Sequence, residues 1–88
     1  MKYQILLDQL AIEHIYDLKR SGNKAILKKI SSLLDELTEH PFTGTGKPEA
    51  LKYQLSGLWS RRISHEHRII YRVEENNVFV LSVKGHYT

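Results

Sequence analysis

The sequence has 88 residues, carries 13 Lys and Arg against 10 Asp and Glu for a formal net charge of +3, and has no cysteine. This length predicts one domain spanning residues 1–88, and the lack of cysteine excludes disulfides and thiolate chemistry. No apolar run approaches the ~20 residues of a membrane-spanning helix and the N-terminus has no signal-peptide pattern, so we expect a cytoplasmic protein without membrane contact.

The first forty residues predict a strand followed by two helices. The apolar stretch 3–7 predicts an edge strand, and apolar residues at helical spacing predict a helix over 9–20, with Asp8 as its N-cap. Asn23 is placed to cap a second helix, which ends before Pro41 because the residue before proline avoids helical geometry. Two helices joined by a short loop form a hairpin, whose apolar stripes need a sheet to cover them.

Segment 42–49 is predicted to be a loop. Gly44 and Gly46 precede Lys47, but the glycine spacing of a phosphate-binding loop is absent and no strand leads into the segment. We therefore exclude binding of a nucleoside triphosphate by this loop.

From Tyr53 onward the apolar period changes to two, which predicts strands over 58–64, 68–73 and 78–84. The connections between them are short enough for antiparallel hairpins. One sheet face is apolar and the other carries arginines, so the helices should pack on the apolar face. This order of elements predicts an α+β fold, with a strand and a two-helix hairpin on one side of an antiparallel sheet.

The positive charge is concentrated in the second half of the chain. Residues 1–44 hold six basic and six acidic side chains, whereas residues 45–88 hold seven and four. Such a face attracts polyanions, although for an arbitrary small protein a solvated strand surface is the first interpretation. The basic residues of its densest part are Lys47, Lys52, Arg61, Arg62, Arg68 and Arg72.

Cleavage of RNA without a metal needs a base for the 2′-hydroxyl, an acid for the leaving oxygen and cations for the phosphate. Each suitable residue is, taken alone, more often structural, and composition does not show that they converge. The second half contains every kind that is required: Glu49, Lys52, Arg62, Arg68, His86 and Tyr87.

The other histidines are interpreted as incidental. His65 and His67 on either side of Glu66 are candidate metal ligands, but they straddle a turn and lack a clear third ligand. His14 and His40 are interpreted in the same way.

Three aromatic residues, Tyr53, Trp59 and Tyr71, could stack on nucleic-acid bases. Trp59 and Tyr71 fall on the apolar face of their predicted strands, so core packing is the favoured interpretation for both.

Four strings in fixed order carry a family resemblance: G-K-P-E-x-L-K at 46–52, W-S-R-R-I at 59–63, E-H-R at 66–68 and H-Y at 86–87. Together they closely resemble the YoeB/Txe-type toxins of the RelE superfamily, over about residues 41–87. The resemblance implies a RelE-like fold, in which an N-terminal strand and a two-helix hairpin pack on one face of a twisted antiparallel sheet.

The resemblance also implies an activity and partners. Such toxins are small endoribonucleases that cut mRNA in the ribosomal A site, so mRNA and the ribosome are expected partners. A cognate antitoxin would hold the toxin inactive, and a homodimer is compatible with the family. No metal or cofactor is expected.

By position in the motif, the resemblance assigns Glu49 as the general base on the 2′-hydroxyl and His86 as the general acid for the leaving group. Arg68 would hold the scissile phosphate, and Tyr87 would orient the substrate beside His86. The expected products are a 2′,3′-cyclic phosphate and a 5′-hydroxyl.

Lys52 and Arg62 would help to bind the phosphate backbone. Arg62 and Arg68 flank a tight turn, so we expect them to come close across paired strands. A phosphate would bridge two guanidinium groups well, since each donates bidentate hydrogen bonds.

Two other functions remain open. The same fold occurs in non-enzymatic toxins that inhibit DNA gyrase and lack the catalytic set, which the presence of Glu49, Arg68 and His86 argues against. A basic RNA-binding module would bind RNA in a salt-sensitive way without creating new RNA ends.

Overall fold

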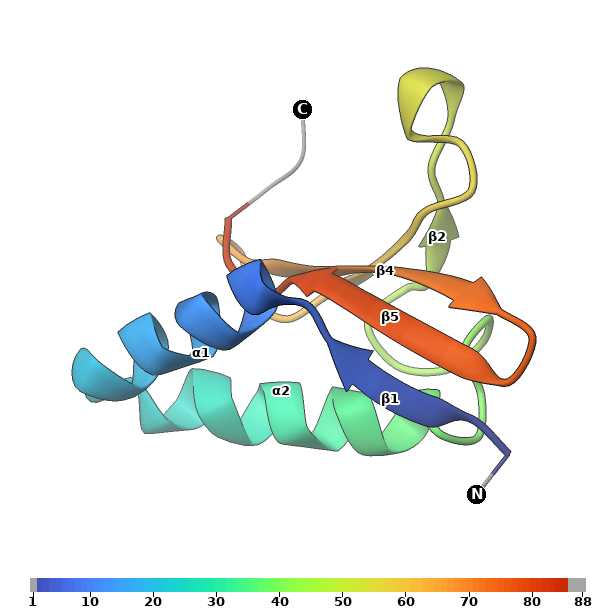
Figure 1. The fold of residues 1–88 in the computed structure, drawn as a ribbon. Coiled ribbons are helices and arrows are strands. Elements are labelled where there is room, and N and C mark those ends of the chain that lie inside the picture. The colour runs from blue at the N-terminus through green and yellow to red at the C-terminus, as the bar shows by residue number, and fades with distance from the viewer. Residues whose placement is uncertain (1, 86–88) are drawn as a thin grey trace.

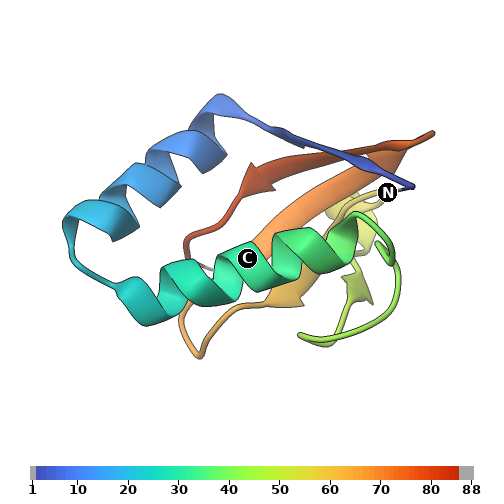
Figure 2. The ribbon, with the colours of Figure 1, turned by 90° about the horizontal axis from the view of Figure 1, so that it is seen from below.

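Two helices cover one face of a five-stranded sheet in a computed structural model that describes residues 2–85 (Figure 1). Seen from the helical side, both helices lie across the same face of the sheet (Figure 2). The strand order is β1-β5-β4-β3-β2. The elements are β1 (Gln4–Leu7), α1 (Gln9–Arg20), α2 (Lys24–Leu37), β2 (Glu49–Ala50), the 3₁₀ helix η1 (Tyr53–Leu55), β3 (Trp59–Arg62), β4 (Arg68–Glu74) and β5 (Asn77–Ser82).

The α+β fold with a helical hairpin on one face of the sheet is confirmed. Strands β2, β3, β4 and β5 pair in antiparallel fashion, whereas β1 lies at the edge and pairs parallel to β5. A parallel pair needs a long crossover connection, and everything between β1 and β5 supplies it. Because the two strands are far apart in sequence, their relative direction leaves no local signal.

The helix boundaries follow local signals. The side chain of Asn23 accepts a hydrogen bond from the Ile26 amide at the start of α2, as an N-cap does. Asp8 occupies the N-cap position of α1, but its side chain makes no capping bond. Helix α2 ends at Leu37, ahead of Pro41 as predicted.

The core lies between the helices and the inner sheet face. The inner face of the sheet contributes alternate residues of β3 and β4 and the valines of β5 to this core. Half-buried Trp59 packs against the buried cluster. Tyr71 is fully buried, so the predicted core positions of both aromatic residues are confirmed. The buried cluster comprises Ala11, Leu18, Ile30, Leu33, Leu37, Ile63, Ile69, Tyr71, Val78, Val80 and Val83.

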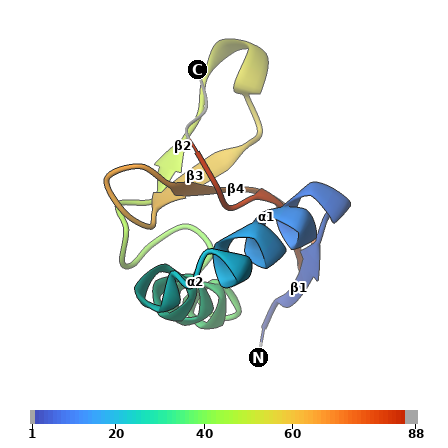
Figure 3. The same ribbon diagram turned by 90° about the vertical axis from the view of Figure 1, so that its left-hand side faces the viewer.

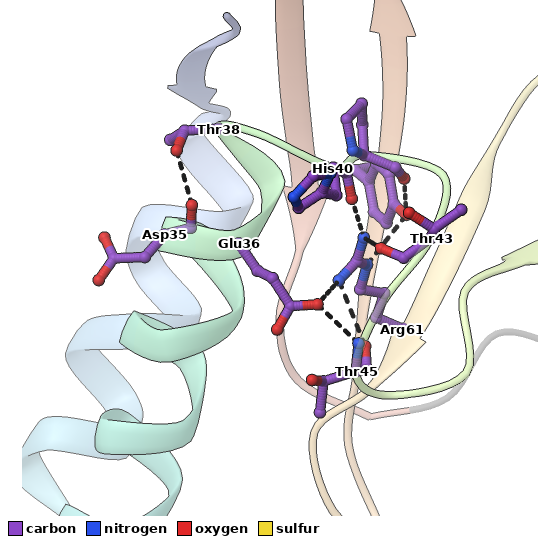
Figure 4. A network of polar contacts seen from close by, with 9 residues as sticks. Asp35, Glu36, Thr38, His40, Thr43, Thr45 and Arg61 are labelled. Atoms are coloured by element: carbon purple, nitrogen blue, oxygen red, sulfur yellow. Dashed lines mark hydrogen bonds and ion pairs between the residues drawn. The ribbon is translucent and has the colours of Figure 1, made fainter. Parts of the chain in front are cut away.

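Arg61 is fully buried on the helical side of the sheet, and a network of polar contacts surrounds it (Figure 4). Its guanidinium forms an ion pair with Glu36 of α2 at 2.8 Å and donates to the carbonyls of His40, Thr43 and Thr45. The prediction that Arg61 belongs with the surface cations is wrong, because the loop that follows α2 encloses its side chain.

The hydroxyl of Tyr71 extends the same network. It accepts a hydrogen bond from Arg61 Nε at 3.3 Å and donates one to the Pro41 carbonyl at 2.6 Å. Burial raises the pKa of the Tyr71 phenol, although the Arg61 hydrogen bond opposes that effect. The network thus ties the loop after α2 to the middle of the sheet.

Residues 51–58, named the arm here, rise from the sheet on the side opposite the helices (Figures 1 and 3). The arm includes η1 and follows β2. Neither β2 nor η1 was predicted, because a two-residue strand is too short to show a period.

Candidate active site

The sheet face away from the helices, called the open face here, carries the polar residues of the central strands. Register fixes its members, because directly opposed residues project to the same side of a sheet. Glu49 is opposite Ser60, and Arg62 is opposite Arg68. Their strand neighbours Trp59, Arg61 and Ile69 lie on the helical side.

Glu49 is the first residue of β2, where a loop was predicted. The loop before it is fixed to β3, because the amide of Arg62 donates to the Gly46 carbonyl at 2.7 Å. Gly46 has a positive φ of 84°, and a Cβ there would lie 2.8 Å from the Arg62 carbonyl oxygen. Only glycine fits so close an approach, and this approach brings Glu49 into register with β3.

Arg62 and Arg68 lie directly opposite each other on β3 and β4, which confirms the expectation that they come close. The Arg68 guanidinium donates a hydrogen bond to the buried Ser60 hydroxyl at 3.3 Å. Like charges directly opposed across a ladder destabilise it. An anion bound between the two guanidinium groups would remove that repulsion.

Lys52 is exposed at the base of the arm and does not lie on a strand. Residues 49–55 line a hollow of about 420 Å³ that includes Glu49 and Lys52. Arg62 borders a different hollow of about 360 Å³, together with Lys29 and Lys47. The two predicted backbone-binding cations therefore border two different hollows.

The chain returns to this region at its end. The Arg68 amide donates a hydrogen bond to the Gly85 carbonyl at 3.1 Å, so Gly85 lies beside the start of β4. His86 and Tyr87, assigned as general acid and substrate-orienting residue, lie outside the described residues.

Ser60 and Lys29 were missed as neighbours of the site. Ser60 is fully buried beneath Arg68, and nothing in its sequence context distinguishes it from any other strand serine. Lys29 falls on the water-facing side of a helix, and only the packing of α2 against the loop at Gly46 and Lys47 brings it near Arg62.

In the range 2–85 no three His, Asp or Glu side chains gather as metal ligands. No helix within it is both long and apolar enough to cross a membrane.

A family model described as the YoeB-like toxin of bacterial type II toxin-antitoxin systems matches residues 11–87. Toxin YoeB of Escherichia coli strain K12 is 46% identical over 65 residues, or 74% of this chain and 77% of that protein. The YoeB dimer from Staphylococcus aureus superposes with a TM-score of 0.87 at 38% identity, covering 99% of this chain and 100% of that one. The YoeB-YefM complex from the same species gives 0.84 at 39% identity, with the same coverage.

The family model begins within α1 and covers α2 and the strands that carry the open face. The structural matches span nearly the full length of both chains, which confirms the RelE-like fold. The chain belongs to the family of YoeB-like toxins of bacterial type II toxin–antitoxin systems.

Proposed function

We propose that this toxin is an endoribonuclease that cuts messenger RNA on the ribosome by attack of a ribose 2′-hydroxyl on the adjoining phosphodiester. The observation that carries the proposal is the strand register, which puts Glu49, Arg62 and Arg68 on one open face. These side chains are a carboxylate and two guanidinium groups. They are the groups needed to accept a proton and to hold a phosphate whose negative charge grows.

The order of the strands supports the division of roles. Neighbouring strands lie about 4.8 Å apart, so β2 and β4 are separated by roughly 10 Å. Glu49 approaches Arg68 from the β2 side, whereas Gly85 is bonded to Arg68 from the β5 side. His86 directly follows Gly85 in the chain. We therefore assign the base to the β2 side of Arg68 and the acid to its β5 side, because an in-line displacement needs the two groups on opposite sides of the phosphate.

The proposed reaction is one transesterification. Glu49 takes the proton of the 2′-hydroxyl, and the 2′-oxygen forms a bond to phosphorus. The bond from phosphorus to the 5′-oxygen breaks, and His86 gives that oxygen a proton. The products are a 2′,3′-cyclic phosphate and a 5′-hydroxyl, and Arg68 stabilises the additional negative charge on the phosphoryl oxygens.

The remaining predicted residues take supporting roles. Lys52 and Arg62 bind phosphates on either side of the scissile one, and Tyr87 orients the substrate beside His86. Since the guanidinium groups carry the charge, this route needs no metal ion or cofactor.

We also propose the partners of this chain from its relatives. The Staphylococcus aureus YoeB was solved both with YefM and as a dimer. By analogy, an antitoxin binds this toxin and a homodimer forms. The messenger is cut in the ribosomal A site, in the cytoplasm.

The test is in vitro translation of a defined message, followed by primer extension to map new RNA ends. The wild-type toxin should create discrete ends. Because loss of a general acid or base typically costs about 10²- to 10⁴-fold in rate, Glu49→Gln and His86→Gln should cut more slowly by that factor. Arg68→Gln should also cut more slowly.

Glu39→Gln and Arg20→Gln are matched controls, since both residues are exposed and far from the open face in the fold. Both should cut at the wild-type rate. Messages left intact by the wild-type toxin, or wild-type cutting by Glu49→Gln, would contradict the proposal. Intact messages together with inhibition of DNA supercoiling would identify a gyrase inhibitor instead.

A further inference from the structure

Two histidines that the proposed reaction does not use hold the end of the described chain. After β5 ends at Ser82, the Val83 amide donates a hydrogen bond to His14 Nδ1 at 3.3 Å. The Gly85 amide donates one to His67 Nδ1 at 2.8 Å. The amides of Val83 and Gly85 therefore both donate hydrogen bonds to imidazole nitrogens. One imidazole belongs to α1 and the other to the turn between β3 and β4.

These bonds require a particular state of each ring. Nδ1 accepts a hydrogen bond only when it carries no proton, so each imidazole must be neutral with its hydrogen on Nε2. Burial and the nearby positive charge of Lys84 lower the pKa of His14, while Asp17 and Glu13 oppose this weakly. His14 therefore favours the neutral form that accepts the bond.

The hydrogen bond that His67 accepts is the one closer to the proposed chemistry. It is shorter than that of His14, and it holds Gly85 rather than a residue three positions before His86. The same Gly85 accepts a hydrogen bond from the Arg68 amide at 3.1 Å. His67 and Arg68 together therefore hold both polar backbone groups of Gly85.

We propose that His67 is a positioning residue for His86: its imidazole anchors Gly85 and so sets where the following residue meets the scissile phosphate. This inference rests on the proposed nuclease function. Consecutive Cα atoms are about 3.8 Å apart, so fixing Gly85 restricts the reach of His86. Gly85 has a φ of 79° and the conformational freedom of glycine, so its two hydrogen bonds, to His67 and from Arg68, restrict a backbone that would otherwise have many conformations.

Substitutions of His67 separate the acceptor from the rest of the ring. Asparagine carries its amide oxygen on Cγ, the atom to which Nδ1 is attached in histidine, whereas glutamine carries its polar atoms one carbon further out. Asn at position 67 should therefore keep the bond to Gly85, and both Gln and Ala should lose it.

The first readout is the steady-state kinetics of message cleavage. Misplacement of a reacting group by about 1 Å costs on the order of 10²-fold, so His67→Ala and His67→Gln should lower kcat by roughly 10- to 100-fold. KM should change little, because the residues that bind the substrate are intact. His67→Asn should recover most of the wild-type kcat, and His65→Ala is the matched control for an exposed histidine nearby.

The second readout does not depend on activity. Hydrogen exchange of the Gly85 amide should be fast in His67→Ala and His67→Gln, and slow in wild type and His67→Asn. If His67→Ala does not fold, the comparison of Gln with Asn decides the question.

The outcomes separate the two proposals. Wild-type kcat in His67→Gln, or equal losses in Asn and Gln, would overturn the positioning role. A wild-type toxin that cuts no RNA would overturn the nuclease function, and the Gly85 exchange rates would then still test the anchor. Exchange at Gly85 that does not respond to any His67 variant would overturn the anchor itself.

Discussion

Arg61 is the residue on which the loop after α2 depends. Its guanidinium is fully buried, and it serves Glu36, three backbone carbonyls and the Tyr71 hydroxyl. Removing one partner of a buried ion pair costs about 3–5 kcal/mol. We therefore expect Arg61→Leu to lower the free energy of unfolding by about that amount, as measured by urea denaturation.

Arg20 provides the control for Arg61. It pairs with Asp17 at 2.6 Å, but its side chain is 78% exposed. Exposed pairs contribute about 0–1 kcal/mol, so Arg20→Leu should unfold almost like the wild type. Equal losses in the two variants would mean that the buried network does not stabilise the fold.

Glu36 makes the same network sensitive to acid. Partial burial acts to raise the pKa of its carboxyl, but hydrogen bonds from Thr45 and Arg61 more than offset this and place the pKa below its ordinary 4.5. A lowered folded-state pKa means that the stabilisation is present above pH 4.5 and is lost as pH falls through the folded value. Wild-type stability should therefore fall more steeply below pH 4.5 than that of Glu36→Gln.

Urea denaturation over a series of acidic pH values measures this slope. Parallel stability curves for the wild type and Glu36→Gln would contradict the assigned role of the carboxylate. Glu39→Gln, which alters an exposed carboxylate two residues beyond α2, should reproduce the wild-type slope.

The arm is the element for which the proposed function predicts a direct contact with RNA. Tyr53 at its 3₁₀ helix is 92% exposed and has a left-handed φ of 58°, so it is held out from the sheet at some conformational cost. Under the proposed function its ring stacks on an RNA base, which contributes about 1–3 kcal/mol. Tyr53→Ala should therefore weaken RNA binding by roughly 5- to 150-fold, and Tyr53→Phe should not.

Fluorescence anisotropy with a labelled RNA measures this effect, in a Glu49→Gln background that prevents cleavage. The thermal midpoint should not change, because so exposed a ring contributes little to packing. Equal affinities of the Ala and Phe variants would exclude stacking by this residue.

Elements with their own periodic pattern could be predicted, and elements defined by pairing could not. Both helices and the strands β1, β3, β4 and β5 match their predicted ranges within a few residues. In contrast, β2 exists only because it pairs with β3, and its partner is not visible in its two residues. The bulge at Leu81, which puts Val80 and Val83 in the core while Phe79 faces Arg72, also depends on the neighbouring strand.

The candidate site shows the same division. The family resemblance points to Glu49, Arg62 and Arg68 as site residues, and the predicted hairpin brings the two arginines together, as the strand register confirms. No local pattern indicates that Ser60 is buried beneath Arg68, or that a polar network surrounds the side chain of Arg61. Arg61 and Arg62 are adjacent, so strand alternation puts them on opposite faces of the sheet. The enclosure of Arg61 in a polar network depends on the loop packed over the helical side, which the strand pattern does not show.

For the molecule as a whole, the distribution of basic residues agrees with the proposed function. The excess of basic residues belongs to residues 45–88, which build β2 to β5. The balanced first half supplies the edge strand β1 and the two helices, and the helices cover the face opposite the arm (Figure 3). Burial of Arg61 removes one cation from the surface, but Arg62 and Arg68 remain on the open face. The fold thus places Arg62 and Arg68 side by side on one face, where a polyanion can approach.

The central claim is that a 2′-hydroxyl is the nucleophile in a reaction carried out on the open face. The most direct measurement is cleavage of two translated messages that differ only by a 2′-deoxy substitution at the mapped cleavage site. The account predicts that the ribose message is cut to a 2′,3′-cyclic phosphate and a 5′-hydroxyl, and that the deoxy message stays intact at that site. Cutting of the deoxy message at a comparable rate, or products with a 5′-phosphate, would contradict it.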